Sequence, residues 1–408
     1  MKRLLLAPHD PAELLGGTER VVEAMAAARI RRGDEVAIVA GSERMEGVGA
    51  REMRSAPGLS VLRLLRATNE TAEVFLRPWI RAEVERVVDG IRPDVIEWHH
   101  GSTLSLDLVR ATKRAGVPVV MFLHDLWTSC PRFFRIPPAG IRCPEGGDRT
   151  PCAPCVGRDL PWEPEKLDGW VGFYTSESRA ELAAADLRIV PSLAHGRALQ
   201  SYFPDLDLAL RVVPHGLLET GLSPPARRTT AAESGRLHVV SFGNLVPEKG
   251  LEDLVDAIER LPDPSRVSLD LHGRELTPGF VDRLRARAPR VRLAWHGAYA
   301  SFVAISEDVA KADVAAFPSR APESYGLVVD EAIAAGLPAL VSNRGAFAER
   351  AGDSCSVLPA ENPDAWAKAL AELLDAKALE RMRGAVPRQV RTIEEALDEI
   401  DALVGRRG

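Results

Sequence analysis

Residues 314–341 decide the fold class, and they read VAAFPSRAPESYGLVVDEAIAAGLPALV. The segment begins and ends with short apolar runs, 314–317 and 339–341, which are typical of buried strands. Between them lie a polar loop and an apolar stretch with helical spacing that stops at Gly336 and Pro338. This order of strand, helix and strand predicts two parallel neighbours in one sheet, because parallel strands need a crossover connection.

Two carboxylates frame the start of this predicted helix. Glu323 lies in the loop just before it, and Glu331 lies about a turn and a half inside it. A helix that begins near Gly326 offers phosphate its unpaired first N–H groups and the positive end of its dipole. Phosphate-binding N–H groups beside two carboxylates suit a ligand with both phosphate and hydroxyl groups, and a nucleotide-sugar is such a ligand.

The same alternation of strands and helices runs through almost the whole chain and predicts parallel sheets covered on both faces. It stops once, at 222–235, where a stretch without periodicity predicts a linker. We therefore expect an α/β fold of two Rossmann-like domains, 1–220 and 221–388, facing each other across a ligand-binding cleft. A last helix within 389–408 can pack back on the first domain. The expected strands are 3–7, 35–40, 94–98, 118–123, 187–190, 210–213, 237–242, 267–271, 291–295, 314–317, 339–341 and 356–358.

Length and composition limit the class of protein. A chain of 408 residues is too long for one compact core, and 46% hydrophobic with 27% charged residues is typical of a globular enzyme. The net charge of −6 favours no nucleic-acid partner. The first residues predict a buried strand rather than a signal peptide, and no apolar stretch approaches the roughly 20 residues of a spanning helix. We expect a cytoplasmic protein, and basic residues clustered on one face would allow peripheral contact with the inner face of the membrane.

The second half of the chain opens with a strand that ends at Gly243, followed by Asn244 and, at the start of the next helix, Lys249. A glycine there lets the backbone approach a ligand closely, and a lysine can meet a diphosphate. A plain strand, turn and helix with a surface lysine is the alternative for this segment alone. The carboxylates of Glu323 and Glu331 in the same half favour the ligand-binding interpretation.

These motifs together resemble the retaining GT-B glycosyltransferases of glycosyltransferase family four (glycosyl transferases group 1). The resemblance covers nearly the whole chain. It is carried, in the family's order, by Gly16-Gly17, His124-Asp125, the segment from Gly243 to Lys249-Gly250, and the pair Glu323 and Glu331.

The resemblance implies that the second domain binds the nucleotide-sugar donor. Glu323 would bond hydroxyls of the donor sugar, and Glu331 would bond the ribose hydroxyls. Lys249 would neutralise the charge that grows on the leaving diphosphate. The backbone of the loop and helix start would hold the diphosphate, at Ser324, Tyr325, Gly326 and Leu327.

Asn244 departs from the family, which usually has an arginine at this position. A phosphate-binding arginine is then expected from elsewhere in the second domain, and Arg320 and Arg274 are the candidates.

The resemblance assigns the first domain to the acceptor side. His124 would contact the donor sugar and help stabilise positive charge at the anomeric carbon; the alternative is a histidine that ties down the following loop. Gly16 and Gly17 precede a helix whose first N–H groups could reach the diphosphate. The acceptor-side candidates follow two strand ends, where polar caps are the alternative: Glu97, His99, His100 and Asp125.

A cysteine cluster lies in the loop 126–165, which has no secondary-structure pattern. Its members are Cys130, Cys143, Cys152 and Cys155. Four thiolates can form a closed tetrahedral site, so we predict a structural zinc ion that orders the loop beside the acceptor. Free or redox-active thiols and an iron–sulfur cluster are the alternatives, and Cys355 in an apolar strand is expected in the core.

Together these features predict transfer of a hexose-type sugar from a nucleotide-diphosphate-sugar to an acceptor hydroxyl, with retention at the anomeric carbon and without a catalytic metal. The acceptor classes left open are a glycan, a lipid-linked sugar and a small-molecule natural product. Two alternatives remain open. One is a nucleotide-sugar epimerase on the same fold. The other is a zinc-bearing binding protein that has lost catalysis, with Asn244 as its sign.

Overall fold

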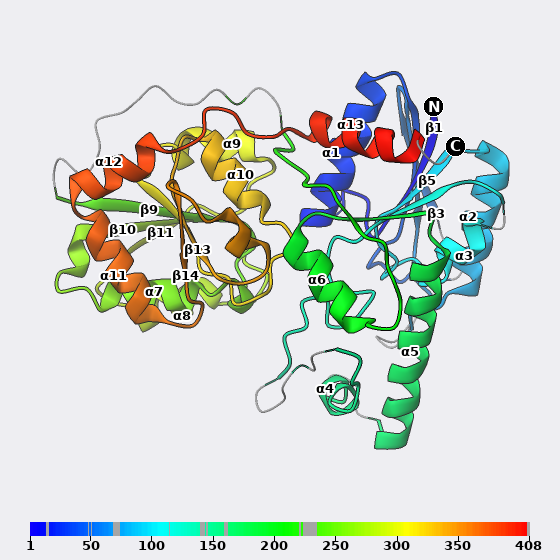
Figure 1. Ribbon diagram of the computed structural model, residues 1–408, viewed down its shortest axis with the longest axis horizontal. Coiled ribbons are helices and arrows are strands. Elements are labelled where there is room, and N and C mark those ends of the chain that lie inside the picture. Colours follow the sequence, from blue (N-terminus) through cyan, green and yellow to red (C-terminus); the bar gives the residue numbers. More distant parts are fainter. Residues whose placement is uncertain are drawn as a thin grey trace. The chain divides into compact units, whose positions relative to one another are not determined.

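The computed structural model describes residues 1–13, 16–47, 49, 51–67, 74–113, 115–138, 143, 146–158, 162–219, 222 and 235–405. The chain divides into two compact units (Figure 1). Unit 1 comprises Met1–Pro214 and Ile393–Gly408, and unit 2 comprises His215–Thr392. The predicted linker at 222–235 lies outside the described residues except for its two ends.

Unit 1 contains an eight-stranded sheet in the order β3-β4-β2-β1-β5-β6-β7-β8. All its neighbours are parallel except β3, which runs antiparallel to β4. Its strands are β1 (Lys2–Ala7), β2 (Glu35–Ala40), β3 (Arg51–Ala56), β4 (Leu59–Leu64), β5 (Val95–Trp98), β6 (Val119–Phe122), β7 (Leu187–Val190) and β8 (Arg211–Val212). Its helices are α1 (Gly17–Arg31), α2 (Pro78–Ile91), α3 (Leu108–Lys113), α4 (Cys152–Val156), α5 (Pro164–Ala184), α6 (Leu193–Tyr202) and α13 (Ile393–Gly405).

Unit 2 contains a six-stranded, fully parallel sheet in the order β11-β10-β9-β12-β13-β14. Its strands are β9 (Leu237–Phe242), β10 (Val267–His272), β11 (Arg292–Trp295), β12 (Val314–Phe317), β13 (Ala339–Ser342) and β14 (Cys355–Leu358). Its helices are η2 (Pro247–Lys249), α7 (Leu251–Glu259), η3 (Pro264–Arg266), α8 (Phe280–Arg287), α9 (Phe302–Val309), α10 (Leu327–Ala334), η4 (Ala346–Arg350), α11 (Pro363–Leu373) and α12 (Ala376–Gly384).

Both sheets carry a buried core on each face. In unit 1 the residues of β1 alternate between two hydrophobic clusters, with Leu4 and Leu6 in one and Leu5 in the other. In unit 2 the strand β9 does the same, with Val239 on one side and Val240 on the other. Strands buried on both faces read as continuous apolar runs, which is why the sequence predicted them. The predicted α/β class with two parallel-sheet units is confirmed.

The order of the strands reverses once in each sheet. In unit 1 the reversal lies between β1 and β5, and in unit 2 it lies between β9 and β12. Ligands of open parallel sheets bind at such points, beyond the carboxyl ends of the strands. The loops that follow these four strands are therefore the places to look for a site.

The sequence did not predict the strands β3 and β4. Nearly all side chains of β3 are exposed, and its residues REMRSA show no apolar run. It pairs with β4 across a tight turn at Gly58, where φ is +75°. For β3 the reason is that an exposed edge strand buries little apolar surface and so leaves little hydrophobic signal in the sequence.

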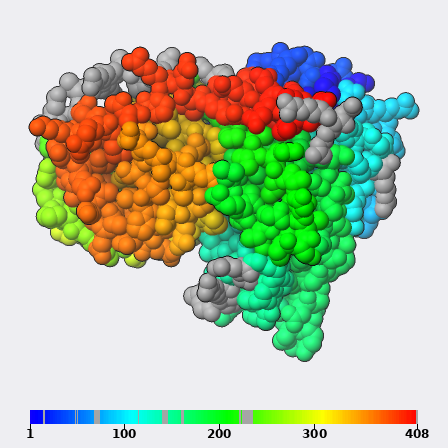
Figure 2. Space-filling view, in the orientation of Figure 1, coloured from blue at the N-terminus to red at the C-terminus, as the bar shows by residue number. Residues whose placement is uncertain are grey.

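The C-terminal helix α13 packs on unit 1. Its buried face contains Ile393, Ala396, Leu397 and Ile400. Ion pairs add to this contact: Glu394 of α13 pairs with Arg31 at 2.6 Å and with Arg32 at 3.0 Å. In Figure 2 the red surface of α13 adjoins the blue surface of the first residues.

In the part of the chain that the structure describes, no helix is both long enough and apolar enough to span a bilayer.

Candidate active site

The loops after β9 and β12 bring a lysine and a glutamate together in unit 2. Nζ of Lys249 donates to Oε1 of Glu323 at 2.7 Å, although the two residues are 74 positions apart. The side chains are partly open to solvent, 36% for Lys249 and 14% for Glu323. The main chain fixes the loop, because the N–H of Ala346 donates to the carbonyl of Glu323 at 2.7 Å. The pair is thus held in place and remains accessible to a ligand.

The helix α10 begins immediately after Gly326, as the sequence predicts. Gly326 has φ +84° and ψ +60°, in the left-handed region that glycine favours. A Cβ atom at this position would lie 2.3 Å from Cε1 of Phe347. Both restraints require glycine, and a glycine cap leaves the first N–H groups of α10 without a capping side chain. The helix start therefore offers donors to an anion beside Glu323.

Tyr325 anchors this loop from inside unit 2. Its hydroxyl donates to Asp330 at 2.5 Å and accepts from the N–H of Gly216 at 2.9 Å. Arg350 completes the group, with an ion pair to Asp330 at 2.9 Å. Burial, with the nearby charge of Asp330, raises the pKa of Tyr325 to about 12, so the phenol stays neutral. Tyr325 is 5% exposed, and only its backbone can take part in phosphate binding.

Glu331 lies within α10 and is 3% exposed, so its carboxylate is much less accessible than that of Glu323. Gly243 follows β9 with φ +120°, and its N–H donates to the carbonyl of His272 at 3.0 Å. Its main chain thus turns at the end of the strand, at the position that the sequence assigned to the donor. Asn244 is next in the chain and partly exposed.

The two candidates for the missing arginine differ sharply. Arg320 is bound by two carboxylates of α7, at 2.8 Å to Glu252 and 2.6 Å to Asp253. Arg274 follows β10 and is exposed. Its carbonyl accepts the N–H of Leu245 at 2.9 Å, directly after Asn244. Arg274 is therefore the better placed of the two to act where the family has its arginine.

The strand ends of unit 1 pair four of the predicted residues. Nδ1 of His99 lies 2.9 Å from Nε2 of His124, and Nε2 of His100 lies 3.2 Å from Oδ2 of Asp125. His99 and His100 follow β5, and His124 and Asp125 follow β6. The N–H of Ser102 donates to Nδ1 of His100 at 3.1 Å, so Nε2 of His100 carries the proton that Asp125 accepts. His99 thus contacts His124, and its neighbour His100 contacts Asp125.

Burial separates these four residues into inner and outer ones. His99 is 0% exposed, whereas His124 is 7% exposed. Burial tends to raise the pKa of Asp125, but His100 and the N–H of Trp127 lower it below its usual value, so Asp125 is ionised. His124 and Asp125 therefore form the more accessible edge of this group.

Glu97 does not face solvent. It is 1% exposed, and its Oε1 forms ion pairs with Arg3 and Arg29, each at 2.8 Å. The expectation that Glu97 and His99 line an acceptor pocket is not supported on this point, because Glu97 is held by Arg3 and Arg29 and the side chain of His99 is 0% exposed. The cause is the position of Glu97 within β5, where both faces of the sheet are covered.

The sequence did not indicate two further polar groups near the predicted residues. Glu19 lies in the first turn of α1, beside Gly16, and its Oε1 contacts Nδ1 of His9 at 2.8 Å. A carboxylate therefore already lies at the helix start that the sequence assigned to phosphate. His195 of α6 is buried near Asp125, and burial lowers its pKa to about 4. Only the polar character of these residues at strand and helix ends could have indicated them.

The four cysteines of the loop 126–165 line one pocket of unit 1. The pocket has about 500 Å³ of empty space, part of it open to solvent, and Tyr174 and Tyr202 also line it. Burial raises the pKa of Cys130 to about 12, and the neighbouring thiols add to this. Among the described residues, however, no three His, Cys, Asp or Glu side chains are placed to hold a metal ion. This geometry does not support the predicted zinc site. Part of the loop, including 139–142 and 144–145, lies outside the described residues.

Two doubly wound parallel sheets, one with a lysine, a glutamate and a helix start at its strand reversal, are typical of the GT-B fold of glycosyltransferases. The glycosyltransferase family 4 model matches residues 15–217, and the model described as glycosyl transferases group 1 matches residues 236–376. The chain belongs to this family of glycosyltransferases.

Curated relatives match parts of the chain. A phosphatidyl-myo-inositol mannosyltransferase of Mycobacterium tuberculosis is 34% identical over 173 residues, which are 39% of this chain and 42% of that protein. A D-inositol 3-phosphate glycosyltransferase of Jonesia denitrificans is 30% identical over 218 residues, 51% of this chain and 48% of that protein. The matches thus span less than half the length of either relative.

Solved structures match the whole fold. The sucrose-phosphate synthase of Thermosynechococcus elongatus gives a TM-score of 0.68 at 17% identity, over 100% of both chains. HepE of Anabaena, solved with UDP and glucose, gives 0.65 at 16% identity, over 98% of this chain and 99% of the other. At these identities the likeness establishes the fold alone.

Proposed function

We propose that this protein is a glycosyltransferase that moves a hexose-type sugar from a nucleotide-diphosphate-sugar to an acceptor hydroxyl with retention at the anomeric carbon. The observation that carries the proposal is the contact of Lys249 with Glu323 beside the start of α10. It combines a cation, helix N–H donors and a hydroxyl-binding carboxylate. Such a set suits the diphosphate and the sugar of one donor.

In the proposed reaction, unit 2 holds the donor. The N–H groups of Gly326 and Leu327 bind the diphosphate, and Lys249 neutralises the charge that develops on it as the bond to the sugar breaks. Glu323 accepts hydrogen bonds from hydroxyls of the transferred sugar. Glu331, one turn further along α10, is assigned to the ribose. Arg274 is assigned to the phosphates in place of Asn244.

The bond changes of the proposed transfer balance without an enzyme nucleophile. The bond between the anomeric carbon and the diphosphate oxygen breaks, and the acceptor oxygen forms the new bond on the same face. The acceptor proton passes to the leaving diphosphate. His124 of unit 1 is assigned to the transferred sugar, where it helps to stabilise the positive charge of the anomeric carbon. Lys249 and the helix N–H groups supply the charge that magnesium gives in other transferases, so transfer is expected to proceed in a metal chelator.

The acceptor is proposed to be a polyol or sugar hydroxyl, free or attached to a lipid. Two relatives support this class by their names, which specify phosphatidyl-myo-inositol and D-inositol 3-phosphate. A lipid-attached acceptor would place the protein at the cytoplasmic face of a membrane. Vesicle flotation with and without anionic lipid tests that part of the proposal.

No step of the proposed mechanism is assigned to zinc, and the described cysteines are not arranged around a metal ion. Elemental analysis of the purified chain tests this directly. One zinc per chain, lost on Cys152→Ser or Cys155→Ser but kept on Cys355→Ser, would restore the zinc prediction.

A screen of nucleoside diphosphates and their sugars tests the donor part of the proposal. A nucleotide at 100 times its Kd raises the stability of the folded chain by about 2.7 kcal/mol, which thermal unfolding detects. The stabilising sugar nucleotide is then incubated with inositol and sugar acceptors, and the nucleoside diphosphate released is measured. Binding and release support the proposal, whereas no stabilisation by any nucleotide contradicts it.

A further inference from the structure

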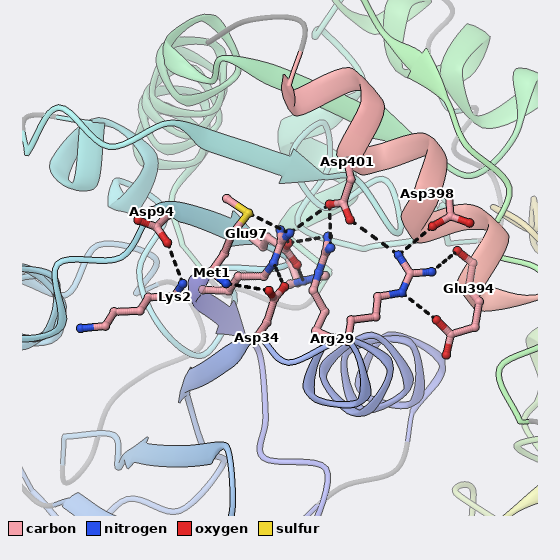
Figure 3. Close-up of polar contacts among 12 residues, drawn as sticks. Met1, Lys2, Arg29, Asp34, Asp94, Glu97, Glu394, Asp398 and Asp401 are labelled. Atoms are coloured by element: carbon pink, nitrogen blue, oxygen red, sulfur yellow. Dashed lines mark hydrogen bonds and ion pairs between the residues drawn. The ribbon is translucent and has the colours of Figure 1, made fainter.

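A series of charged side chains, buried except for Asp401, connects the C-terminal helix with Glu97 (Figure 3). Arg29 of α1 contacts Oδ1 of Asp401 at 2.7 Å and Oε1 of Glu97 at 2.8 Å. Arg3 of β1 reaches the same two oxygens, at 3.0 Å for Asp401 and 2.8 Å for Glu97. Both arginines therefore hold the same oxygen of Glu97, which leaves the other oxygen toward His99.

The second oxygen of Glu97, Oε2, faces Nε2 of His99. Oε2 of Glu97 lies 3.9 Å from Nε2 of His99. Both atoms are buried, and within the described residues neither has a hydrogen-bond partner. Nδ1 of His99 lies 2.9 Å from Nε2 of His124. The ring of Phe122 stacks on His99 with 4.6 Å between centroids and 8° between planes, which restrains the orientation of the imidazole.

The charges of this group decide where the protons lie. Burial tends to raise the pKa of Glu97, but Arg29, His99 and Arg3 bring it down to about 2, so the carboxylate is ionised. Burial lowers the pKa of His99, so its ring is neutral and carries one proton. A proton on Nε2 turns a positive N–H toward the carboxylate, whereas a lone pair there would be repelled. The Nε2–H form of His99 is therefore favoured, and its Nδ1 is an acceptor.

We propose that Glu97 and His99 are positioning residues for His124, and that they fix the proton of His124 on Nε2 and leave Nδ1 as its basic nitrogen. Because Nδ1 of His99 accepts in the 2.9 Å contact, the shared proton belongs to His124. The partner of one imidazole nitrogen commonly sets the function of the other. The action of His124 on a sugar rests on the proposed function, but its tautomer does not.

Side-chain NMR of the full chain labelled with ¹⁵N-histidine tests this proposal without any assay of transfer. The chain has nine histidines, and the signals of His124 are assigned by their loss in His124→Gln. In the unaltered protein, Nε2 of His124 is expected to be protonated in an excess of about 10-fold over Nδ1. Glu97→Gln keeps the size of the side chain and removes its charge. The excess is expected to fall by about 10-fold in that variant.

Asp34→Asn is the matched control. Asp34 forms an ion pair with Arg3 at 2.5 Å, so its replacement also removes a carboxylate from this cluster without touching a histidine. It is expected to leave the signals of His124 unchanged. His124 protonated on Nδ1 in the unaltered protein, or equal His124 spectra in Glu97→Gln and Asp34→Asn, would overturn the proposal.

A pair of substitutions at His99 covers the case in which Glu97→Gln does not fold, because it leaves the charges of the cluster intact. His99→Leu removes the nitrogen that accepts from His124, and His124 is then expected to lose its preference for the Nε2–H form. His99→Asn offers a side-chain oxygen near the position of Nδ1 and is expected to restore the Nε2–H form. Loss of the Nε2–H form of His124 in both variants, or in neither, contradicts the proposal. The predicted tautomer in a chain that binds and transfers no sugar nucleotide would refute the proposed function alone.

Discussion

The pairs Lys249–Glu323 in unit 2 and Arg29–Glu97 in unit 1 have the same chemistry in opposite surroundings. Their shortest contacts are 2.7 Å and 2.8 Å. The side chains of the first pair are 36% and 14% exposed, and those of the second are 0% and 1% exposed. An accessible pair can exchange its partner for a ligand, whereas a buried pair can only hold its neighbours in place. Burial therefore separates the pair Lys249 and Glu323, proposed to bind the donor, from the pair Arg29 and Glu97, proposed to hold its neighbours in place.

The largest effect is expected when one member of the buried pair is removed. Arg29→Met deletes a cation that Glu97 and Asp401 share. Breaking a buried pair typically costs about 3–5 kcal/mol, and urea unfolding should show a loss in that range. Asp398→Asn is the control, because Asp398 pairs with Arg32 at 2.9 Å with 72% of its side chain exposed. A loss below about 1 kcal/mol for Arg29→Met would mean that burial does not distinguish the two pairs.

The accessible pair should affect catalysis rather than stability. Glu323→Gln keeps the shape of the side chain and removes the charge that binds Lys249, and the rate of transfer should fall about 10²–10³-fold, as for other lost electrostatic contacts. Thermal unfolding should change little. Glu259→Gln is the control, since Glu259 binds Arg290 at the far end of α7. Equal transfer rates for the two variants would contradict the role of Glu323.

The pair of His9 and Glu19 provides an intermediate case whose strength depends on pH. Burial tends to lower the pKa of His9, but contacts with Glu19 and Glu43 raise it from 6.5 to about 9. The folded chain therefore binds the proton more tightly than the unfolded chain. This stabilisation is fully present below pH 6.5 and is lost as the pH rises to about 9. The free energy of unfolding should decline over that window by on the order of 2 kcal/mol, and Glu19→Gln should flatten the decline.

The smallest effect is expected at Arg274, the exposed arginine that is proposed to bind the phosphates where the family has its own arginine. Arg274→Ala should raise the KM for the donor about 10-fold and leave kcat nearly unchanged, since one charge-assisted contact is lost in ground state and transition state alike. Arg285→Ala is the control, because Arg285 pairs with Asp282 on the exposed face of α8. A change in kcat without a change in KM would assign Arg274 to the reaction itself.

The sequence predicts most of the parallel sheets and the start of α10 because their physical causes are local. The apolar runs at 314–317 and 339–341 became β12 and β13, and Gly326 became the cap of α10. Both follow from periodicity and from the backbone freedom of glycine. The family prediction is also confirmed, because the two family models match residues 15–217 and 236–376.

The buried charge cluster could not be predicted in the same way. Arg3 lies in β1, Glu97 in β5 and Asp401 in α13, so the three meet only when the sheet closes and the last helix packs on it. A charged residue inside an apolar strand is the only trace in the sequence, as in the run VIEW of β5. For the same reason Glu97 was placed on the acceptor side, where strand-end polar residues often lie.

The donor reaction itself tests the central claim most directly. The full chain is incubated with the sugar nucleotide that stabilises it, in a metal chelator and with a polyol acceptor, and ¹H NMR follows the anomeric proton. We predict release of the nucleoside diphosphate and a product whose anomeric configuration is that of the donor, both lost in Glu323→Gln. An intact nucleotide whose sugar has changed its stereochemistry, or a product of inverted configuration, would contradict the account.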